Sequence, residues 1–240
     1  MTRLLHIVLL LLAAATSALA QQESTSMPET DGQVWMSAST EVKPFRKKDT
    51  EVTQARFFRN LRVFGEAEWR LNDWGGGHKQ VNLNGGLKYS ITKFLRVGSE
   101  YRHAFKDREK SDYDRIYVRT WLQGKRGRLD GDYRFTYEHT FLPIKKIRTL
   151  VRNRFTLEYD IPKWKLDPYL QVETFTGLHY TGNRLVGMRY DLGTKFNLDA
   201  AKRNSLDVAI RFDQETNTPA PENSWVLLLA YELSFNKKKK

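Results

Sequence analysis

The chain has 240 residues, no cysteine, and 40 lysines and arginines against 28 acidic residues, which gives a formal net charge of +12. A chain without cysteine excludes a disulfide scaffold, a thiolate nucleophile and a cysteine-ligated metal site. The basic residues are spread along the whole chain, so we expect anionic lipid head groups or anionic solutes as partners, and no nucleic acid.

The N-terminal segment, residues 1–20, reads MTRLLHIVLLLLAAATSALA. One basic residue precedes an apolar run, and the segment closes on a small-x-small pattern, which is typical of a secretory signal peptide cleaved before Gln21. The apolar run is shorter than the roughly 20 residues that a membrane-spanning helix needs. The sequence therefore predicts export, followed by a flexible segment over residues 21–32.

Residues 33–235 repeat one pattern, in which apolar and polar side chains alternate over segments of about ten residues. Such alternation predicts β-strands with one apolar and one polar face. In chain order the predicted strands are 34–42, 51–58, 62–71, 81–91, 94–103, 115–122, 129–141, 151–161, 169–176, 184–196, 206–213 and 225–235.

The strand number depends on one segment. Without residues 51–58, EVTQARFF, the count is eleven, and an odd number does not close with both termini on the same side of a membrane. Accepting this segment as a strand gives about twelve strands, and ten is the fallback.

The breaks between strands alternate in length along the chain. The shorter breaks are 90–93, 124–128, 162–165 and 197–204, and the longer ones are 72–80, 104–112, 142–149, 177–183 and 214–224. Short periplasmic turns that alternate with longer extracellular loops are typical of a bacterial outer-membrane barrel.

A soluble sandwich or a lipocalin-like barrel would show the same alternation, with its apolar face turned inward. The expected export, the strand lengths and the aromatic residues near strand ends favour a membrane barrel. These aromatic residues are Trp69, Tyr89, Phe94, Phe105, Trp121, Phe141 and Phe235. We therefore predict an all-β, antiparallel transmembrane barrel in the outer membrane, with Val63, Ala67, Leu157 and Leu229 facing lipid.

Several stretches carry a family resemblance: EAEWRLND, LRVGSEYRHAF, RNRFTLEYDIP, LDPYLQVETF and SLDVAIRFD, in this order. They resemble an exported bacterial β-barrel family known only as a domain of unknown function, which implies a fold and a location but no activity. EYRHAFKD with the later DRIYVR is also similar to the oligogalacturonate-specific porins, which are twelve-stranded channels with arginine-lined lumens. The last strand, ending in Phe235, resembles the C-terminal signal that the barrel-assembly machinery reads, although the basic tail 236–240 follows it.

In this arrangement the polar strand faces point into the lumen, where they place more arginines than acids. The candidate lumen residues are Arg62, Glu66, Glu68, Arg70, Arg96, Glu100, Arg102, Arg115, Arg119, Arg134, Glu138, Arg152, Arg154, Glu158, Glu173, Arg189 and Arg211. A lumen of this kind predicts a narrow channel for small, preferably anionic, solutes. The alternative is a closed structural barrel that binds lipopolysaccharide, whose internal charges neutralise one another.

A third alternative is an outer-leaflet lipid hydrolase, because Ser99 and His103 share the outward face of one strand and His139 lies near them. No carboxylate that could orient a histidine is evident on that face, so we predict no catalytic residue. The five histidines lack metal-ligand spacing, and no phosphate loop is present. We therefore expect no cofactor and no metal, with outer-membrane lipid and lipopolysaccharide as the surrounding partners.

Overall fold

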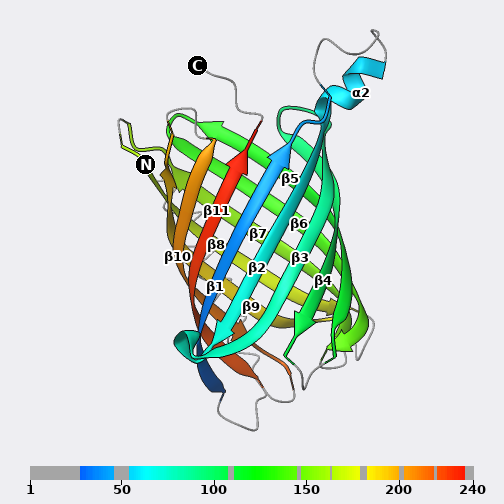
Figure 1. Ribbon diagram of the computed structural model, residues 1–240, viewed down its shortest axis with the longest axis vertical. Coiled ribbons are helices and arrows are strands. Elements are labelled where there is room, and N and C mark those ends of the chain that lie inside the picture. Colours follow the sequence, from blue (N-terminus) through cyan, green and yellow to red (C-terminus); the bar gives the residue numbers. More distant parts are fainter. Residues whose placement is uncertain are drawn as a thin grey trace.

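The computed structural model describes residues 28–45, 54–107, 111–144, 147–162, 164–178, 183–199, 203–218 and 221–235. These residues form a closed barrel of eleven strands, shown in Figure 1. The strands are β1 (Glu29–Val42), β2 (Leu61–Asn72), β3 (Gly77–Ser90), β4 (Leu95–Lys106), β5 (Tyr113–Arg126), β6 (Leu129–Ile144), β7 (Ile147–Tyr159), β8 (Leu166–Leu178), β9 (Arg184–Asn197), β10 (Asn204–Glu215) and β11 (Glu222–Ser234). The all-β, mostly antiparallel barrel fold is thereby confirmed.

Both predicted terminal segments fall largely outside the described residues. The signal peptide at 1–20 and the basic tail at 236–240 lie wholly outside them. Of the segment 21–32, which we expected to be flexible, residues 29–32 already belong to β1.

The predicted strand at 51–58 is wrong. Its first three residues lie outside the described ones, and the rest fall in a short helix, α2 (Gln54–Asn60). Two adjacent aromatic residues break the alternation here: Phe57 stacks on Tyr89 with ring centroids 5.0 Å apart, and Phe58 lies 4.6 Å from Phe45. A strand would send the two neighbouring rings to opposite faces, whereas a helix can place both on one end of the barrel.

The predicted count of twelve strands is therefore also wrong, since the barrel closes with eleven. Its first and last strands, β1 and β11, pair in parallel from Glu29 opposite Glu222 to Glu41 opposite Ser234. All other neighbouring strands pair antiparallel. The parity argument failed because it assumed that the closing pair must also be antiparallel, and one parallel seam removes that requirement.

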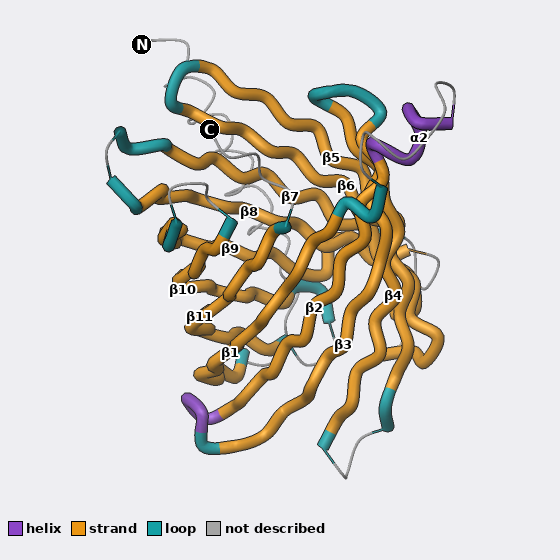
Figure 2. Tube along the Cα trace, turned by 45° about the horizontal axis from the view of Figure 1, so that its top comes forward, coloured by secondary structure: helices purple, strands orange, loops and turns teal. Residues whose placement is uncertain are grey.

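The barrel has two ends, named here by the short helices that mark them in Figures 1 and 2. At the α2 end the connections are 43–60, 91–94, 127–128, 160–165 and 198–203. At the η1 end, marked by the 3-10 turn η1 (Asp73–Gly75), they are 73–76, 107–112, 145–146, 179–183 and 216–221. Apart from 43–60 the two ends do not differ in connection length as expected, because the strands extend into the segments that we had assigned to long loops.

One turn at the α2 end shows how the sequence sets a connection. In the turn 198–203 the Asp199 carboxylate accepts backbone N–H bonds from Arg203 at 2.5 Å and from Asn204 at 3.1 Å. The hydrogen bond from the Asn204 backbone, together with the Arg203 guanidinium, holds the pKa of Asp199 below its usual range. The described residues include no helix with the length and apolar character that a membrane span requires.

The outer surface of the barrel is apolar. Leu192 on β9 is 67 % exposed, Ile210 on β10 is 58 % exposed and Val118 on β5 is 54 % exposed. Every strand adds at least one exposed large apolar side chain, for example Val42, Val63, Leu83, Tyr101, Phe135, Phe155, Leu170 and Trp225. Most charged side chains in the middle of the strands are turned the other way, which is the reverse of a soluble protein.

Four residues test the predicted outward face directly. Val63 and Ala67 are exposed, and Leu157 and Leu229 are half-buried. Among the aromatic residues that we expected at the outer rims, Trp121 differs: it is 9 % exposed and lines the lumen. Trp121 shares its strand face with Tyr117 and Arg119, so period-two alternation places it inward.

Candidate functional site: the barrel lumen

The structure places every candidate lumen residue inside the barrel. All but one line one of two internal cavities, and the exception, Glu173, contacts three arginines of the larger cavity. Period-two alternation puts them there, as β7 illustrates: Arg152 and Arg154 point inward while Phe155, one position further on, is exposed on the outside.

Within the described part of the chain, the lumen contains two large cavities. The larger, of about 560 Å³, extends toward the η1 end, where it reaches Gln33 and Glu215. The smaller, of about 530 Å³, extends toward the α2 end, where it reaches Glu41 and Glu232. Four residues line both cavities, and we call them the waist: Arg154, Tyr169, Gln171 and Asp207.

Glu173 on β8 is the centre of the interior ion-pair network. It is 1 % exposed, and Arg152 binds it in bidentate fashion with N···O distances of 3.1 and 3.0 Å. Arg134 donates to it at 3.0 Å, and Arg189 Nη1 lies 3.6 Å from it. One buried carboxylate therefore neutralises parts of three guanidinium groups, from β6, β7 and β9.

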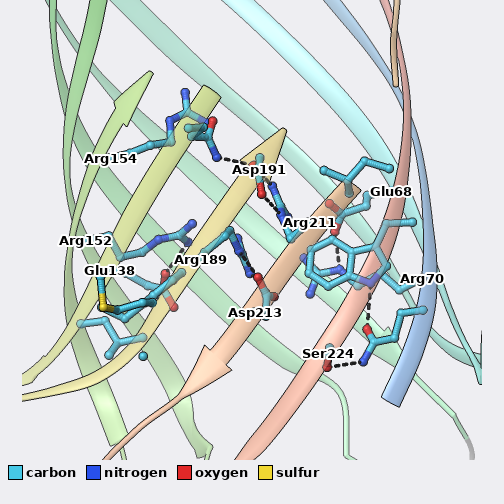
Figure 3. Close-up of a pocket in the computed structure, with 18 of the residues that line it drawn as sticks. Glu68, Arg70, Glu138, Arg152, Arg154, Arg189, Asp191, Arg211, Asp213 and Ser224 are labelled. Carbon is cyan, nitrogen blue, oxygen red and sulfur yellow. Dashed lines mark hydrogen bonds and ion pairs between the residues drawn. The ribbon is translucent and has the colours of Figure 1, made fainter. Parts of the chain in front are cut away.

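Further pairs connect other neighbouring strands, and Figure 3 shows two of them in the larger cavity. Arg189 binds Asp213 at 2.6 and 2.7 Å, and Arg211 binds Asp191 at 2.7 Å through both nitrogens. The same bidentate geometry joins β4 to β5, where Arg119 donates to Glu100 at 2.5 and 3.2 Å. Bidentate arginine–carboxylate pairs are the strongest charge-assisted hydrogen bonds available to side chains.

Trp35 on β1 forms part of the wall of the larger cavity and is 6 % exposed. The guanidinium carbon of Arg70 lies 3.6 Å from its ring centroid, and those of Arg211 and Arg189 lie 5.1 and 5.4 Å away. Its indole N–H donates to Gln33 Oε1 at 2.8 Å. Cation–π contacts with three strands thus hold this ring against the closing seam.

The acids of the lumen were underestimated from the sequence. Among the described residues, ten basic and nine acidic side chains line the larger cavity, and five of each line the smaller one. The candidate set omitted several of these acids: Glu41, Asp132, Asp191, Asp207, Asp213, Glu215, Glu222 and Glu232. Alternation from Arg189 and Arg211 would have found Asp191 and Asp213, since each lies two residues further along the same face.

The outward histidines were also considered as catalytic groups. Here the structure supplies a carboxylate that the sequence did not reveal, because Asp114 on β5 lies 2.6 Å from His103 Nδ1 and accepts a hydrogen bond from Tyr101 at 2.5 Å. Ser99 is four residues from His103 on β4, which places it about 13 Å away along a strand. That separation is too large for His103 to take a proton from Ser99.

His139, the third histidine considered, lies 3.1 Å from the Thr149 hydroxyl and contacts Phe141. In the described part of the chain no group of three or more histidine or acidic side chains could hold a metal ion.

Of the two sequence resemblances, the comparisons with known proteins support the one to a family of unknown function and not the one to the porins. A search of the curated proteins found no match, and a search of the solved structures found none. Residues 32–224, which include all of β2 to β10 and most of β1, match a family described as protein of unknown function, DUF2490. The chain therefore belongs to the DUF2490 family.

Proposed function

We propose that this protein is an outer-membrane β-barrel with a narrow lumen through which small polar solutes pass. The observation that carries the membrane assignment is the inverted distribution of side chains. An outer surface with exposed apolar side chains on every strand encloses an interior of arginines and carboxylates. Soluble monomers rarely expose an apolar patch larger than a few hundred Å², whereas lipid-facing strands require an apolar outer face.

The passage rests on the two cavities. Together they reach from Gln33 and Glu215 near the η1 end to Glu41 and Glu232 near the α2 end. They meet at the waist, where an arginine and an aspartate from different strands leave a polar lining. The near balance of basic and acidic side chains favours small polar solutes with little overall discrimination by charge sign.

A closed structural barrel is the second candidate, and the ion-pair network favours it. Glu173, Glu138 and Asp191 are each at most 2 % exposed and each binds at least one arginine. Such a network fixes the interior side chains and could close the waist. In this case the protein would contribute only its surface, which contacts outer-membrane lipid and lipopolysaccharide.

Two measurements test the proposal in turn. The mature chain is expected to fractionate with the outer membrane and to run at different positions on a gel before and after heating. Recovery in the soluble periplasm would overturn the membrane assignment. Refolded protein in a planar bilayer is then expected to give discrete ionic currents, and a silent membrane with correctly folded protein would favour the closed barrel.

A further inference from the structure

Two arginines of the lumen, Arg134 and Arg154, face each other with unequal neutralisation: Arg134 lies 3.0 Å from Glu173, whereas the ion pair of Arg154 with Asp132 is 4.0 Å long. Arg134 on β6 and Arg154 on β7 are directly opposite in the antiparallel pairing. Like charges directly opposite each other destabilise a sheet. Arg134 and Arg154 repel each other, and each is also repelled by Arg119 and Arg152, while Glu173 attracts both.

A second pair of directly opposite arginines shows how side-chain acceptors can compensate for such a like-charge contact. Arg102 and Arg115 are directly opposite across β4 and β5. Arg102 donates its Nε–H to Asn84 at 2.7 Å, and Arg115 donates its Nε–H to Thr140 at 2.9 Å while its Nη1 lies 2.8 Å from Glu138. In this pair, therefore, side-chain oxygens accept hydrogen bonds from the Nε–H groups of both arginines.

The Nε–H groups of Arg134 and Arg154 have no such acceptor among the described residues. The Nε atoms of Arg119, Arg134 and Arg154 are buried and lack a hydrogen-bond partner among the described residues. The one ion pair of Arg154 in that part of the chain, with Asp132, is 4.0 Å long. A buried N–H without an acceptor destabilises the folded state, so three of them together with a like-charge pair are unfavourable in a purely structural interior.

The three arginines are accessible from the lumen. All of them line the larger cavity, and Arg154, as part of the waist, also lines the smaller one. In the ring of strands β1 and β11 lie across the barrel from β6, and their middle portions add Ser37, Leu228 and Ala230 to the cavity. These three side chains carry no charge, and the carboxylates that already bind Arg119 and Arg134, Glu100 and Glu173, lie on β4 and β8.

We propose that Arg119, Arg134 and Arg154 form a binding site for the oxyanion group of a small solute, a carboxylate, sulfate or phosphate. Such a group presents several acceptor oxygens to planar guanidinium forks, which is the recognition that arginine provides best. It would accept hydrogen bonds from the unpartnered nitrogens and screen the repulsion between Arg134 and Arg154. The inference rests on the proposed passage and deepens it by naming the class of solute held where Arg154 joins the two cavities, although binding itself does not require that solutes cross.

The test uses inorganic sulfate and the full mature chain refolded in detergent. The thermal unfolding midpoint is measured in sodium sulfate and in sodium chloride at equal ionic strength, because a ligand that binds the folded state raises it. We expect an additional stabilisation by sulfate in the wild type, with an apparent dissociation constant at least about tenfold weaker in Arg154→Gln and Arg134→Gln. A tenfold change corresponds to about 1.4 kcal/mol of binding free energy.

The matched control is Arg126→Gln, because Arg126 is exposed at the end of β5, away from the cavities. Sulfate is excluded from protein surfaces and stabilises most folded proteins to some degree. This general effect should be equal in all variants, and only the additional part should be lost when Arg134 or Arg154 is replaced. Arg154→Lys, which keeps the charge but loses the fork, provides a folded variant with intermediate affinity.

Equal responses to sulfate in the wild type, Arg134→Gln, Arg154→Gln and Arg126→Gln would overturn the site, as would a wild type that does not respond. Currents in a planar bilayer test the passage separately. Sulfate-specific stabilisation without currents would leave the binding site and remove the passage, whereas currents without sulfate-specific stabilisation would do the opposite.

Discussion

The outer and inner faces of this barrel follow different rules. On the outside, Leu192, Ile210 and Val118 need only be apolar, since each is more than half exposed and none has a specific partner to satisfy. On the inside, Glu173 must be a carboxylate at one place, because guanidinium groups from three other strands depend on it. The outer face is specified by a pattern and the inner face by pairings, so substitutions on the two faces should have different consequences.

The largest effect is expected on the inner face, from Glu173→Gln. Removing one partner of a buried ion pair costs about 3–5 kcal/mol, because the remaining charges stay buried and unneutralised. Here Arg134, Arg152 and Arg189 would all be affected. The free energy of unfolding in detergent or lipid vesicles measures the loss.

Glu29→Gln is the control, since Glu29 is exposed at the start of β1. An exposed substitution of this kind should change the stability by no more than about 0.5 kcal/mol. If Glu173→Gln proved equally mild, the inner face would not depend on specific pairing, and the comparison between the faces would fail.

The next effect belongs to the outer face. Val118→Arg, near the middle of β5, should cost about 2–4 kcal/mol in a membrane-folding assay because it moves a charge into the hydrocarbon layer. Val118→Leu should be nearly neutral, since any apolar side chain serves there. The cost should be smaller at Leu157, which lies two residues before the end of β7 and so nearer the membrane surface. A neutral Val118→Arg would mean that this surface faces water.

The difference between the two faces also explains what could be predicted from the sequence. Alternation predicted the strands and the inward placement of all the candidate charged residues, because side-chain direction in a strand has a period of two. The choice of a barrel over a sandwich also depended on the expected export, the strand lengths and the aromatic residues near strand ends. The pairings of Glu173 could not be predicted in this way, since they join strands whose register depends on the whole ring. Nor could Asp114 be placed beside His103, because the two residues meet only across the β4–β5 pairing.

The predicted number of strands was wrong for a related reason. The barrel closes through the pairing of its first and last strands, and the sequence of β1 or of β11 does not indicate whether they pair parallel or antiparallel. The aromatic pair Phe57 and Phe58 interrupts the alternation and so indicated that this segment is not a strand. The prediction followed the requirement for an even number of strands instead.

A smaller effect compares tight packing on the two faces. At Gly193, on the inner face, an added Cβ would lie 2.6 Å from the Ala209 Cβ and 2.7 Å from the Tyr169 ring. Gly193→Ala should therefore cost about 1–3 kcal/mol through overpacking. At Gly85, which is exposed on β3, nothing lies within 4 Å of the added atom, so Gly85→Ala should show no packing cost. Equal losses in the two variants would indicate a backbone effect and not packing.

The smallest expected effect concerns ion selectivity. Because basic and acidic side chains line each cavity in nearly equal numbers, the wild-type reversal potential under a salt gradient should be close to zero. Arg154 and Asp207 both lie at the waist, where one charge has most influence on a passing ion. Arg154→Gln should shift the reversal potential toward cation preference, and Asp207→Asn should shift it toward anion preference. Both shifts should shrink as added salt screens the lumen. If both substitutions moved the potential in the same direction, the four shared residues would not form the narrowest part of the path, and the two cavities would connect elsewhere.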